Sequence, residues 1–355
     1  MYAFNIYKFN FNSDYIIKFN LKFWLRVRYL FSFLLFFLFA CSSLPDVSSI
    51  QLKSTAINLD QLEFSEFSDS LDFYHSLSVS QEVLKFQFQS CLSIGSIDKN
   101  GTYTRFKLFK KDPYIKDLHN ELKYSIYPKI PQINEDLKMS FKYLNYYFPD
   151  IPIPSSIVYF NSLFHSNIFC GNKELGIGID CYLGSNSACV KKLPSQEFYQ
   201  WLKNSMRLEY LNRDVLSAWI ISNYIPENNN SVVEQMIRWG KIIYVVERCI
   251  PDYKKNCLLR YPPEKFDWAE KNESSIWKYL VNEQLLFSNN ERDMSFLMNE
   301  GPFTIGLPEK SPDRLGQYIG WKMVHDYMDE HENISLRELI KTPYNSILQT
   351  YKSED

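Results

Sequence analysis

Apolar residues recur with helical spacing over most of the chain. In Gln132–Phe148 they return every three or four residues, which places them on one face of an amphipathic helix ending before Pro149. Residues 230–248 show the same period with a wider apolar stripe. Similar patterns predict further helices over the ranges Asp112–Ser125, 196–205, 209–223, 273–287, 312–330 and 335–349. We therefore expect a mainly helical protein.

A few short runs rich in β-branched and aromatic residues interrupt this pattern and predict a small sheet. The predicted strands lie near Thr55–Leu59, Ser156–Phe160, Phe164–Cys170 and Leu175–Leu183. Asn172-Lys173 can turn a hairpin between the last two. The predicted fold class is α+β, with helices packed around a small mixed sheet.

The N-terminal residues read as a targeting segment. Lys22, Arg26 and Arg28 precede the apolar run Tyr29–Ala40, which is shorter than the roughly 20 residues of a transmembrane helix. Cys41 follows Leu-Phe-Ala, an arrangement that resembles a bacterial lipobox, where the cysteine thiol accepts a diacylglycerol. We predict a signal peptide over 1–40, a lipidated tether over 41–57 and one domain over 58–355. A plain secretory signal is the alternative.

The charge balance limits the possible partners. The formal net charge is −2, which argues against nucleic acid as a ligand. Acyl chains on Cys41, rather than a basic patch, would hold the chain on a lipid bilayer. Ser42 after the cysteine, with no acidic run following, indicates the outer membrane and its periplasmic face. Of the other cysteines, Cys181/Cys189 and Cys249/Cys257 could form disulfides, or all could be buried thiols.

Sequence motifs for catalysis are missing. The chain contains no G-x-x-x-x-G-K-[ST], no G-x-S-x-G and no H-E-x-x-H. His325 and Asp329 are four residues apart, but their acidic surroundings favour a solvated helix face over a metal pair. We predict no catalytic residue, no bound metal and no cofactor.

Three longer stretches carry a family resemblance. They are Leu175–Gly184, Gln235–Tyr244 and Ser311–Val324, the last containing the run Ser-Pro-Asp-Arg-Leu-Gly-Gln-Tyr-Ile-Gly-Trp. Their order resembles the GldB gliding-motility lipoprotein family over about 60–351. Cys181 and Trp239 depart from the family's pattern, in which we expect an apolar residue and a polar or Tyr residue.

This resemblance implies an envelope lipoprotein that supports surface gliding and the associated type IX secretion apparatus. It implies no enzymatic activity, and its partners would be other envelope proteins of that apparatus. The alternatives are a zinc-dependent hydrolase with non-standard ligands and an envelope lipoprotein that binds peptides or carbohydrates.

The layout also resembles zincin-like proteases that have lost their metal site. In one register Glu234 stands at the glutamate of H-E-x-x-H, but Val233 and Ile237 replace the histidines and cannot bind zinc. In another register Trp239-Gly240 stands at the E-G pair of such proteases. We therefore predict a zincin-like scaffold without zinc.

The candidate binding residues of the predicted cleft are Gly176, Gly178, Asp180, Tyr182, Glu234, Lys241 and Arg314. The two strand glycines would form an edge strand that pairs with a partner peptide, or would serve tight internal packing. Asp180, if it points inward, needs a partner such as Lys241 or Arg314. Small residues at 240, 316 and 320 predict closely packed helices.

Overall fold

The computed structural model describes residues 44–97, 99, 101–225 and 231–353. The predicted signal peptide and Cys41 lie outside these residues. Contacts divide the chain into two units, Met1–Asp46 and Val47–Asp355, and all that follows concerns the second. Val47 is buried in the main core, so this compact unit begins before the predicted boundary at residue 58.

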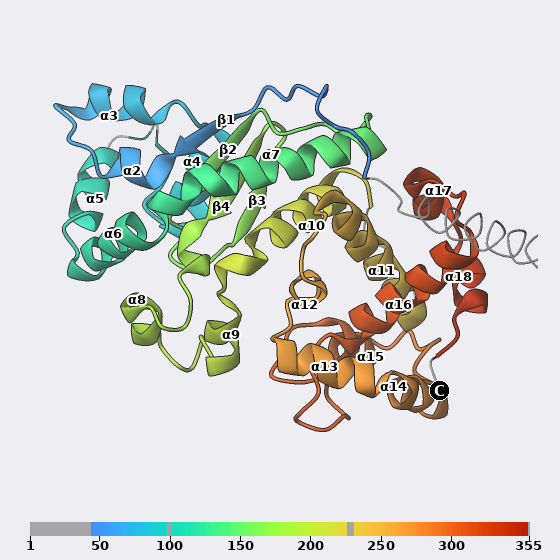
Figure 1. Cartoon of the computed structure of the whole chain (residues 1–355). Helices are drawn as coiled ribbons and strands as arrows, with labels where there is room; N and C mark the ends of the chain where they lie inside the picture. Colours follow the sequence, from blue (N-terminus) through green and yellow to red (C-terminus); the bar gives the residue numbers. More distant parts are fainter. Residues whose placement is uncertain (1–43, 98, 100, 226–230, 354–355) are drawn as a thin grey trace, which may run out of the picture. The chain divides into compact units, whose positions relative to one another are not determined.

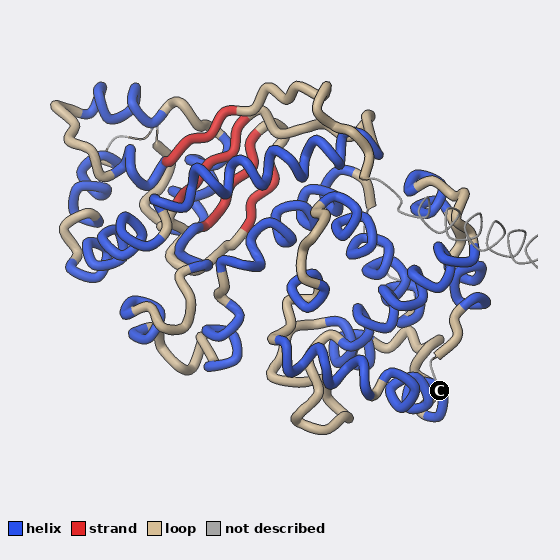
Figure 2. The backbone as a smooth tube through the Cα atoms, in the orientation of Figure 1, coloured by secondary structure: helices blue, strands red, loops and turns tan. Residues whose placement is uncertain are grey.

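A mixed sheet of four strands lies in the N-terminal half (Figures 1 and 2). Its strands are β1 (Thr55–Asn58), β2 (Ser156–Phe160), β3 (Ile168–Cys170) and β4 (Glu174–Gly178). Their order is β1-β2-β4-β3; β1, β2 and β4 are parallel, and β3 runs antiparallel to β4. With 57% of the described residues helical, the predicted α+β class is confirmed.

Two predicted strands are shorter than expected. The strand predicted over 164–170 begins only at Ile168, because Leu163 and Phe164 adopt left-handed φ values of 53° and 63°. The strand predicted over 175–183 ends at Gly178, and the next residues form the 3-10 helix η3 (Ile179–Tyr182).

Helices cover both faces of the sheet. Val158 and Phe160 of β2 point into a smaller core formed with the helices before residue 110, whereas Ile157 and Tyr159 point into the main core. This alternation follows the pleat of a strand buried on both faces. The helices of the smaller core are α2 (Leu59–Glu63), α3 (Ser70–Leu77), α4 (Glu82–Phe86), the π-helix η1 (Gln87–Cys91) and α5 (Thr102–Phe109). The helical segments α6 (Pro113–Ser125), η2 (Tyr127–Lys129) and α7 (Ile130–Tyr147) contribute to the main core.

The C-terminal half is helical. Its segments are α8 (Ala188–Lys192), α9 (Gln200–Ser205), η4 (Leu208–Tyr210), α10 (Leu211–Asn223), α11 (Val232–Cys249), α12 (Lys255–Leu258), α13 (Pro263–Lys271), α14 (Glu273–Asn282), α15 (Glu291–Met298), α16 (Leu315–Glu330), α17 (Leu336–Lys341) and α18 (Tyr344–Thr350). The helix predicted over 335–349 is two helices, because Pro343 between them lacks the N–H that a continuous helix needs. Among the described residues, no helix combines the length and apolar character that a membrane span requires.

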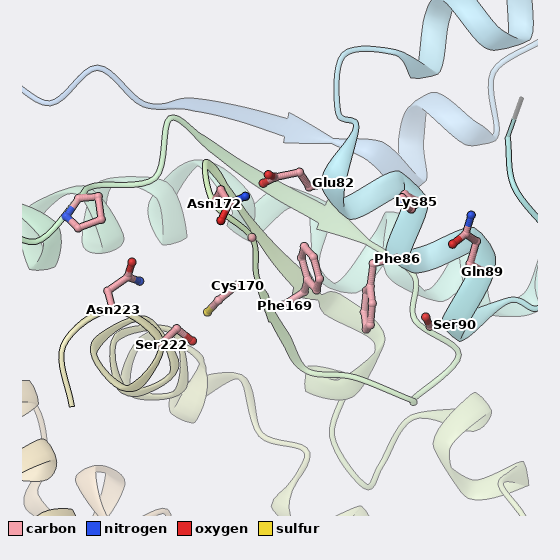
Figure 3. A pocket seen from close by; sticks show the side chains of 12 residues that line it. Glu82, Lys85, Phe86, Gln89, Ser90, Phe169, Cys170, Asn172, Ser222 and Asn223 are labelled. Carbon is pink, nitrogen blue, oxygen red and sulfur yellow. The ribbon is translucent and has the colours of Figure 1, made fainter. Parts of the chain in front are cut away.

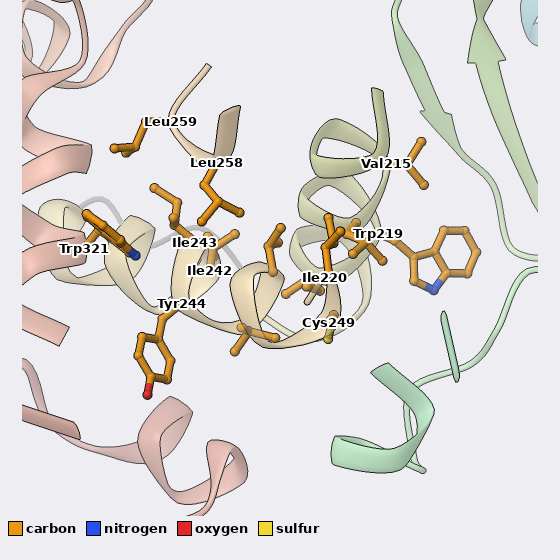
Figure 4. Packing of buried hydrophobic residues seen from close by; sticks show 14 of the residues in the cluster. Val215, Trp219, Ile220, Ile242, Ile243, Tyr244, Cys249, Leu258, Leu259 and Trp321 are labelled. Atoms are coloured by element: carbon orange, nitrogen blue, oxygen red, sulfur yellow. The ribbon is translucent and has the colours of Figure 1, made fainter. Parts of the chain in front are cut away.

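Helices α11 and α16 form the centre of this half. An added Cβ at Gly240 of α11 would overlap the backbone of Gly320 on α16, and one at Gly320 would overlap the backbone of Met236 on α11. The predicted close packing of helices through these glycines is therefore confirmed. The other side of α11 packs against α10 through residues such as Ile220 and Ile242 (Figure 4).

Candidate functional site

A groove runs along the outer edge of strand β3 (Figure 3). Its volume is about 710 Å³. One wall comes from α4 and η1, and the other from Pro152 and the end of α10, with the hairpin between β3 and β4 along the floor. The lining residues are Glu82, Lys85, Phe86, Gln89, Ser90, Pro152, Phe169, Cys170, Gly171, Asn172, Ser222 and Asn223.

The backbone of β3 presents hydrogen-bonding groups to this groove. Gly171 N–H donates to the Glu174 carbonyl at 2.9 Å, and Gly178 N–H donates to the Asn167 carbonyl at 2.9 Å. In an antiparallel ladder the bonded positions alternate, so the backbone groups of Ile168 and Cys170 point away from β4. Ser166 Oγ donates to the Ile168 carbonyl at 3.2 Å. The Ile168 N–H and both backbone groups of Cys170 are therefore the groups offered to a further strand.

Reciprocal contacts hold the hairpin against α4. The Glu174 carboxylate accepts backbone N–H groups at the start of α4, including Glu82 and Val83 at 3.0 and 2.9 Å. Glu82 in return accepts from the N–H groups of Lys173 and Glu174, both at 3.1 Å. Charge-assisted bonds of this kind are stronger than neutral ones. The Phe86 and Phe169 rings stack at 4.5 Å across the groove floor, so contacts within the chain hold the groove in shape.

A second feature is a buried network of ionisable side chains around the start of α10. Asp214 Oδ2 accepts from Tyr182 Oη and from Arg260 Nη1, both at 2.9 Å. Arg314 Nη1 donates to Glu300 Oε1 at 3.2 Å, and Arg260 Nη1 lies 3.9 Å from the same oxygen. The three side chains Asp214, Arg260 and Arg314 are at most 10% exposed.

The network adjoins a cavity of about 250 Å³. Arg260, Arg314 and Glu300 line it, together with Tyr210 and Tyr261. Segments far apart in sequence converge here, since Tyr182 follows β4 and Arg314 precedes α16. The Trp239 ring of α11 lies 5.9 Å from the guanidinium of Arg213, the neighbour of Asp214. All three stretches that carry the family resemblance thus meet at this network.

Burial and ion pairing shift the pKa values of the charged groups of this network in opposite directions. Burial alone would raise the pKa of Glu300, but Arg314, Arg260 and Arg213 lower it below the usual value. Burial works to lower the pKa of Arg260, yet Asp214 and Glu300 raise it above the usual value. Burial and the neighbouring Asp214 raise the pKa of Tyr182 well above the usual value. The arginines and Glu300 are therefore charged at neutral pH, whereas Tyr182 is a neutral donor.

The predicted site residues lie in different parts of the structure. Tyr182 and Arg314 belong to the network. Gly176 and Gly178 lie on β4, which is an inner strand, so their predicted place on an edge strand is wrong. They serve close packing, because a Cβ at Gly178 would overlap the Ser166 carbonyl.

Asp180 is fully buried, but neither of its predicted partners contacts it. It accepts from Ser162 N–H at 2.9 Å and from the N–H of Phe164. Backbone donors thus replace the expected cation, and burial still raises the pKa of Asp180 to about 6. Lys241 instead donates to the Ile340 and Thr342 carbonyls at the end of α17, at 3.1 and 2.6 Å.

Glu234 lies outside both the groove and the network. Its carboxylate accepts from Ser231 Oγ at 3.4 Å at the start of α11. Val233 and Ile237 are buried core residues. Among the described residues, no three His, Cys, Asp or Glu side chains are grouped so that they could hold a metal ion. The six cysteines of the described part are free thiols.

The sequence did not indicate Arg213, Asp214, Arg260 or Glu300 as site residues. The pair Arg213-Asp214 inside an otherwise apolar helical pattern was a possible signal, because charges on a buried helix need partners. The sequence contained no such signal for Arg260, because an arginine in a loop is ordinarily exposed to solvent.

Comparison with known proteins identifies the family to which the chain belongs. A family model described as gliding motility protein GldB matches residues 40–353. No curated protein and no solved structure matches the chain. The match covers most of the chain, which therefore belongs to this family.

Proposed function

We propose that this member of the GldB family is a membrane-anchored lipoprotein that supports gliding motility and the associated type IX secretion apparatus without catalysing a reaction. The family match supports the link to gliding motility. Cys41, in its lipobox-like context, would carry the lipid anchor. We place it on the periplasmic face of the outer membrane.

The groove along β3 is the observation that carries the proposed mode of action. Its floor offers the Cys170 N–H and carbonyl, and the Phe86–Phe169 pair offers an aromatic anchor. An extended segment of a partner protein would add to the sheet by backbone hydrogen bonds, while side chains on the groove walls would provide selectivity. Lipid anchoring confines the groove to the membrane surface, which raises its effective concentration for envelope partners.

Two features support binding rather than hydrolysis. The carboxylates of buried Asp214 and of partly buried Asp313 are engaged by arginines, whereas a general base must reach the proton that it abstracts. The α10 side chain that lies over the Trp239 ring is Arg213, and a guanidinium is not a zinc ligand.

Proline substitutions in the native host test the groove. Cys170→Pro removes one of the two outward N–H groups of β3 but leaves the hydrogen bonds of β3 to β4, so the fold is retained. Ala56→Pro is the matched control, because Thr55 N–H bonds the Ser155 carbonyl and the next residue of parallel β1 points outward at the opposite edge. We expect Cys170→Pro to abolish colony spreading and type IX secretion, and Ala56→Pro to preserve both.

Two results would contradict the proposal. If gene deletion leaves spreading and secretion unchanged, the proposed function is wrong. If deletion abolishes them but Cys170→Pro behaves like the wild type at equal abundance in the membrane fraction, the groove is not the contact.

A further inference from the structure

The buried network contains more hydrogen-bond donors than acceptors. Asp214 uses both carboxylate oxygens, one for Arg213 at 3.5 Å and the other for Arg260 and Tyr182. Yet Arg213 Nη2, Arg260 Nε and Tyr210 Oη are buried without a hydrogen-bond partner. A buried donor left without an acceptor costs free energy, because it has lost its hydrogen bonds to water. Oxygen acceptors supplied from outside would remove this cost.

The cavity beside the network has the chemistry to receive such acceptors. Arg260 and Arg314 line it together with Tyr210, which is 1% exposed. The Arg260 guanidinium lies 5.4 Å from the Tyr210 ring centre, so these two donors share one corner. The volume of about 250 Å³ corresponds to roughly eight water molecules. It accommodates a small molecule or the end of a chain.

Backbone strain positions the two arginines. Arg260 and Arg314 have φ values of 56° and 51°, in the left-handed region. This region is unfavourable for a residue other than glycine, and such positions concentrate at ligand-binding and active sites. Here the strained backbone places two guanidinium groups beside the cavity. A planar guanidinium can donate two parallel hydrogen bonds to the oxygens of a carboxylate or phosphate.

The Glu300 carboxylate lies against both of these arginines. Its Oε1 lies 3.2 Å from Arg314 Nη1 and 3.9 Å from Arg260 Nη1. Unlike the arginines, its side chain is 39% exposed, so it can turn into solvent without a large burial cost. A ligand oxyanion would then take the place of the Glu300 carboxylate.

We propose that this cavity binds an oxyanion, a carboxylate or phosphate group of a small ligand or chain end, through Arg260, Arg314 and Tyr210. The site is distinct from the groove along β3, and it does not depend on the proposed role in motility.

The first experiment measures ligand-induced stabilisation of the full chain in detergent. The probes are acetate, inorganic phosphate, and triglycine with a free or an amidated C-terminus, against sodium chloride at equal ionic strength. We expect a saturable rise in Tm with at least one oxyanion, and none with the amide. Acetate and free triglycine distinguish a carboxylate ligand from phosphate. No rise beyond chloride with any probe would overturn the proposal.

Variants with opposite expected effects separate binding from folding. Tyr210→Phe removes a hydroxyl that has no hydrogen-bond partner within the chain, so the variant should fold and should bind the oxyanion several-fold more weakly. Arg260→Gln should weaken binding ~10-fold or more, since a charge-assisted pair is lost. Glu300→Gln should strengthen binding, because it removes the competing carboxylate.

The control is Arg337→Gln, which breaks an exposed ion pair with Asp150 and should bind like the wild type. Calorimetric titration of each variant with the stabilising probe gives the Kd. If Tyr210→Phe and Glu300→Gln both bind like the wild type, the oxyanion does not occupy this cavity.

Discussion

Replacing Gly240 by Ala is expected to destabilise the chain, although alanine is the better helix former. In an uncrowded helix the change would stabilise by about 1 kcal/mol. Here the new Cβ would lie 2.9 Å from the Trp321 backbone nitrogen and closer still to the Gly320 carbonyl. Both are backbone atoms of α16, so no side-chain rotation relieves the overlap, and α11 and α16 must move apart.

The size of the effect follows from the packing that this movement disrupts. A gap of 0.5–1 Å already forfeits about a quarter to a half of each dispersion contact. Overpacking typically costs about 1–3 kcal/mol, and a contact between two backbones belongs at the upper end. We therefore expect a loss of about 3 kcal/mol and a fall in Tm of roughly 5–10 °C.

Thermal and urea denaturation of the purified chain measure this effect. Gly301→Ala is the control, because its Cβ would meet the Phe303 carbonyl at an ordinary contact distance of 3.5 Å. The control should be within about 0.5 kcal/mol of the wild type. A Gly240→Ala chain as stable as the wild type would refute the close approach of the two helices.

Three further predictions concern the anchor, the buried acid and the metal. Cys41→Ala should move the chain from the membrane to the soluble fraction; an unchanged membrane fraction would contradict acylation. Burial raises the pKa of Asp180 from 3.8 to about 6, so its stabilising contribution is complete below pH 4 and is lost as the pH rises through 6. The stability difference between wild type and Asp180→Asn should therefore shrink by on the order of 2–3 kcal/mol between pH 4 and 7, and urea titrations at both pH values would show no such change if Asp180 titrated normally. Elemental analysis should find no stoichiometric zinc, and one tightly bound ion per chain would refute a scaffold without a metal site.

Periodicity was sufficient to predict the longer elements. The predicted Ser156–Phe160 strand matches β2, and the predicted 230–248 helix is within two residues of α11. These segments bury a regular apolar face, so sequence and packing agree. The glycine positions likewise predicted close helix packing, although only the structure shows that α11 and α16 are the two helices that meet there.

The candidate site was harder to predict, because its contacts join loops that are distant in sequence. Asp180 illustrates the limit: its charge was recognised as needing partners, but those partners are backbone N–H groups that any sequence could supply. Arg260 and Arg314 adopt left-handed conformations that no local residue preference favours. Tertiary contacts impose such conformations, so they cannot be read from the sequence around them.

Helix α10 contributes residues to both sites. Asp214 near its start belongs to the ion network, and Ser222 and Asn223 at its end line the groove along β3. Eight residues separate Asp214 from Ser222, a rise of about 12 Å. The helix is packed between the sheet and α11 (Figure 4), so it fixes the distance between a surface suited to a polypeptide strand and a cavity suited to an oxyanion. Because a rigid element by itself transmits no preference, the two sites should bind independently, and a cavity ligand should leave the groove's affinity unchanged.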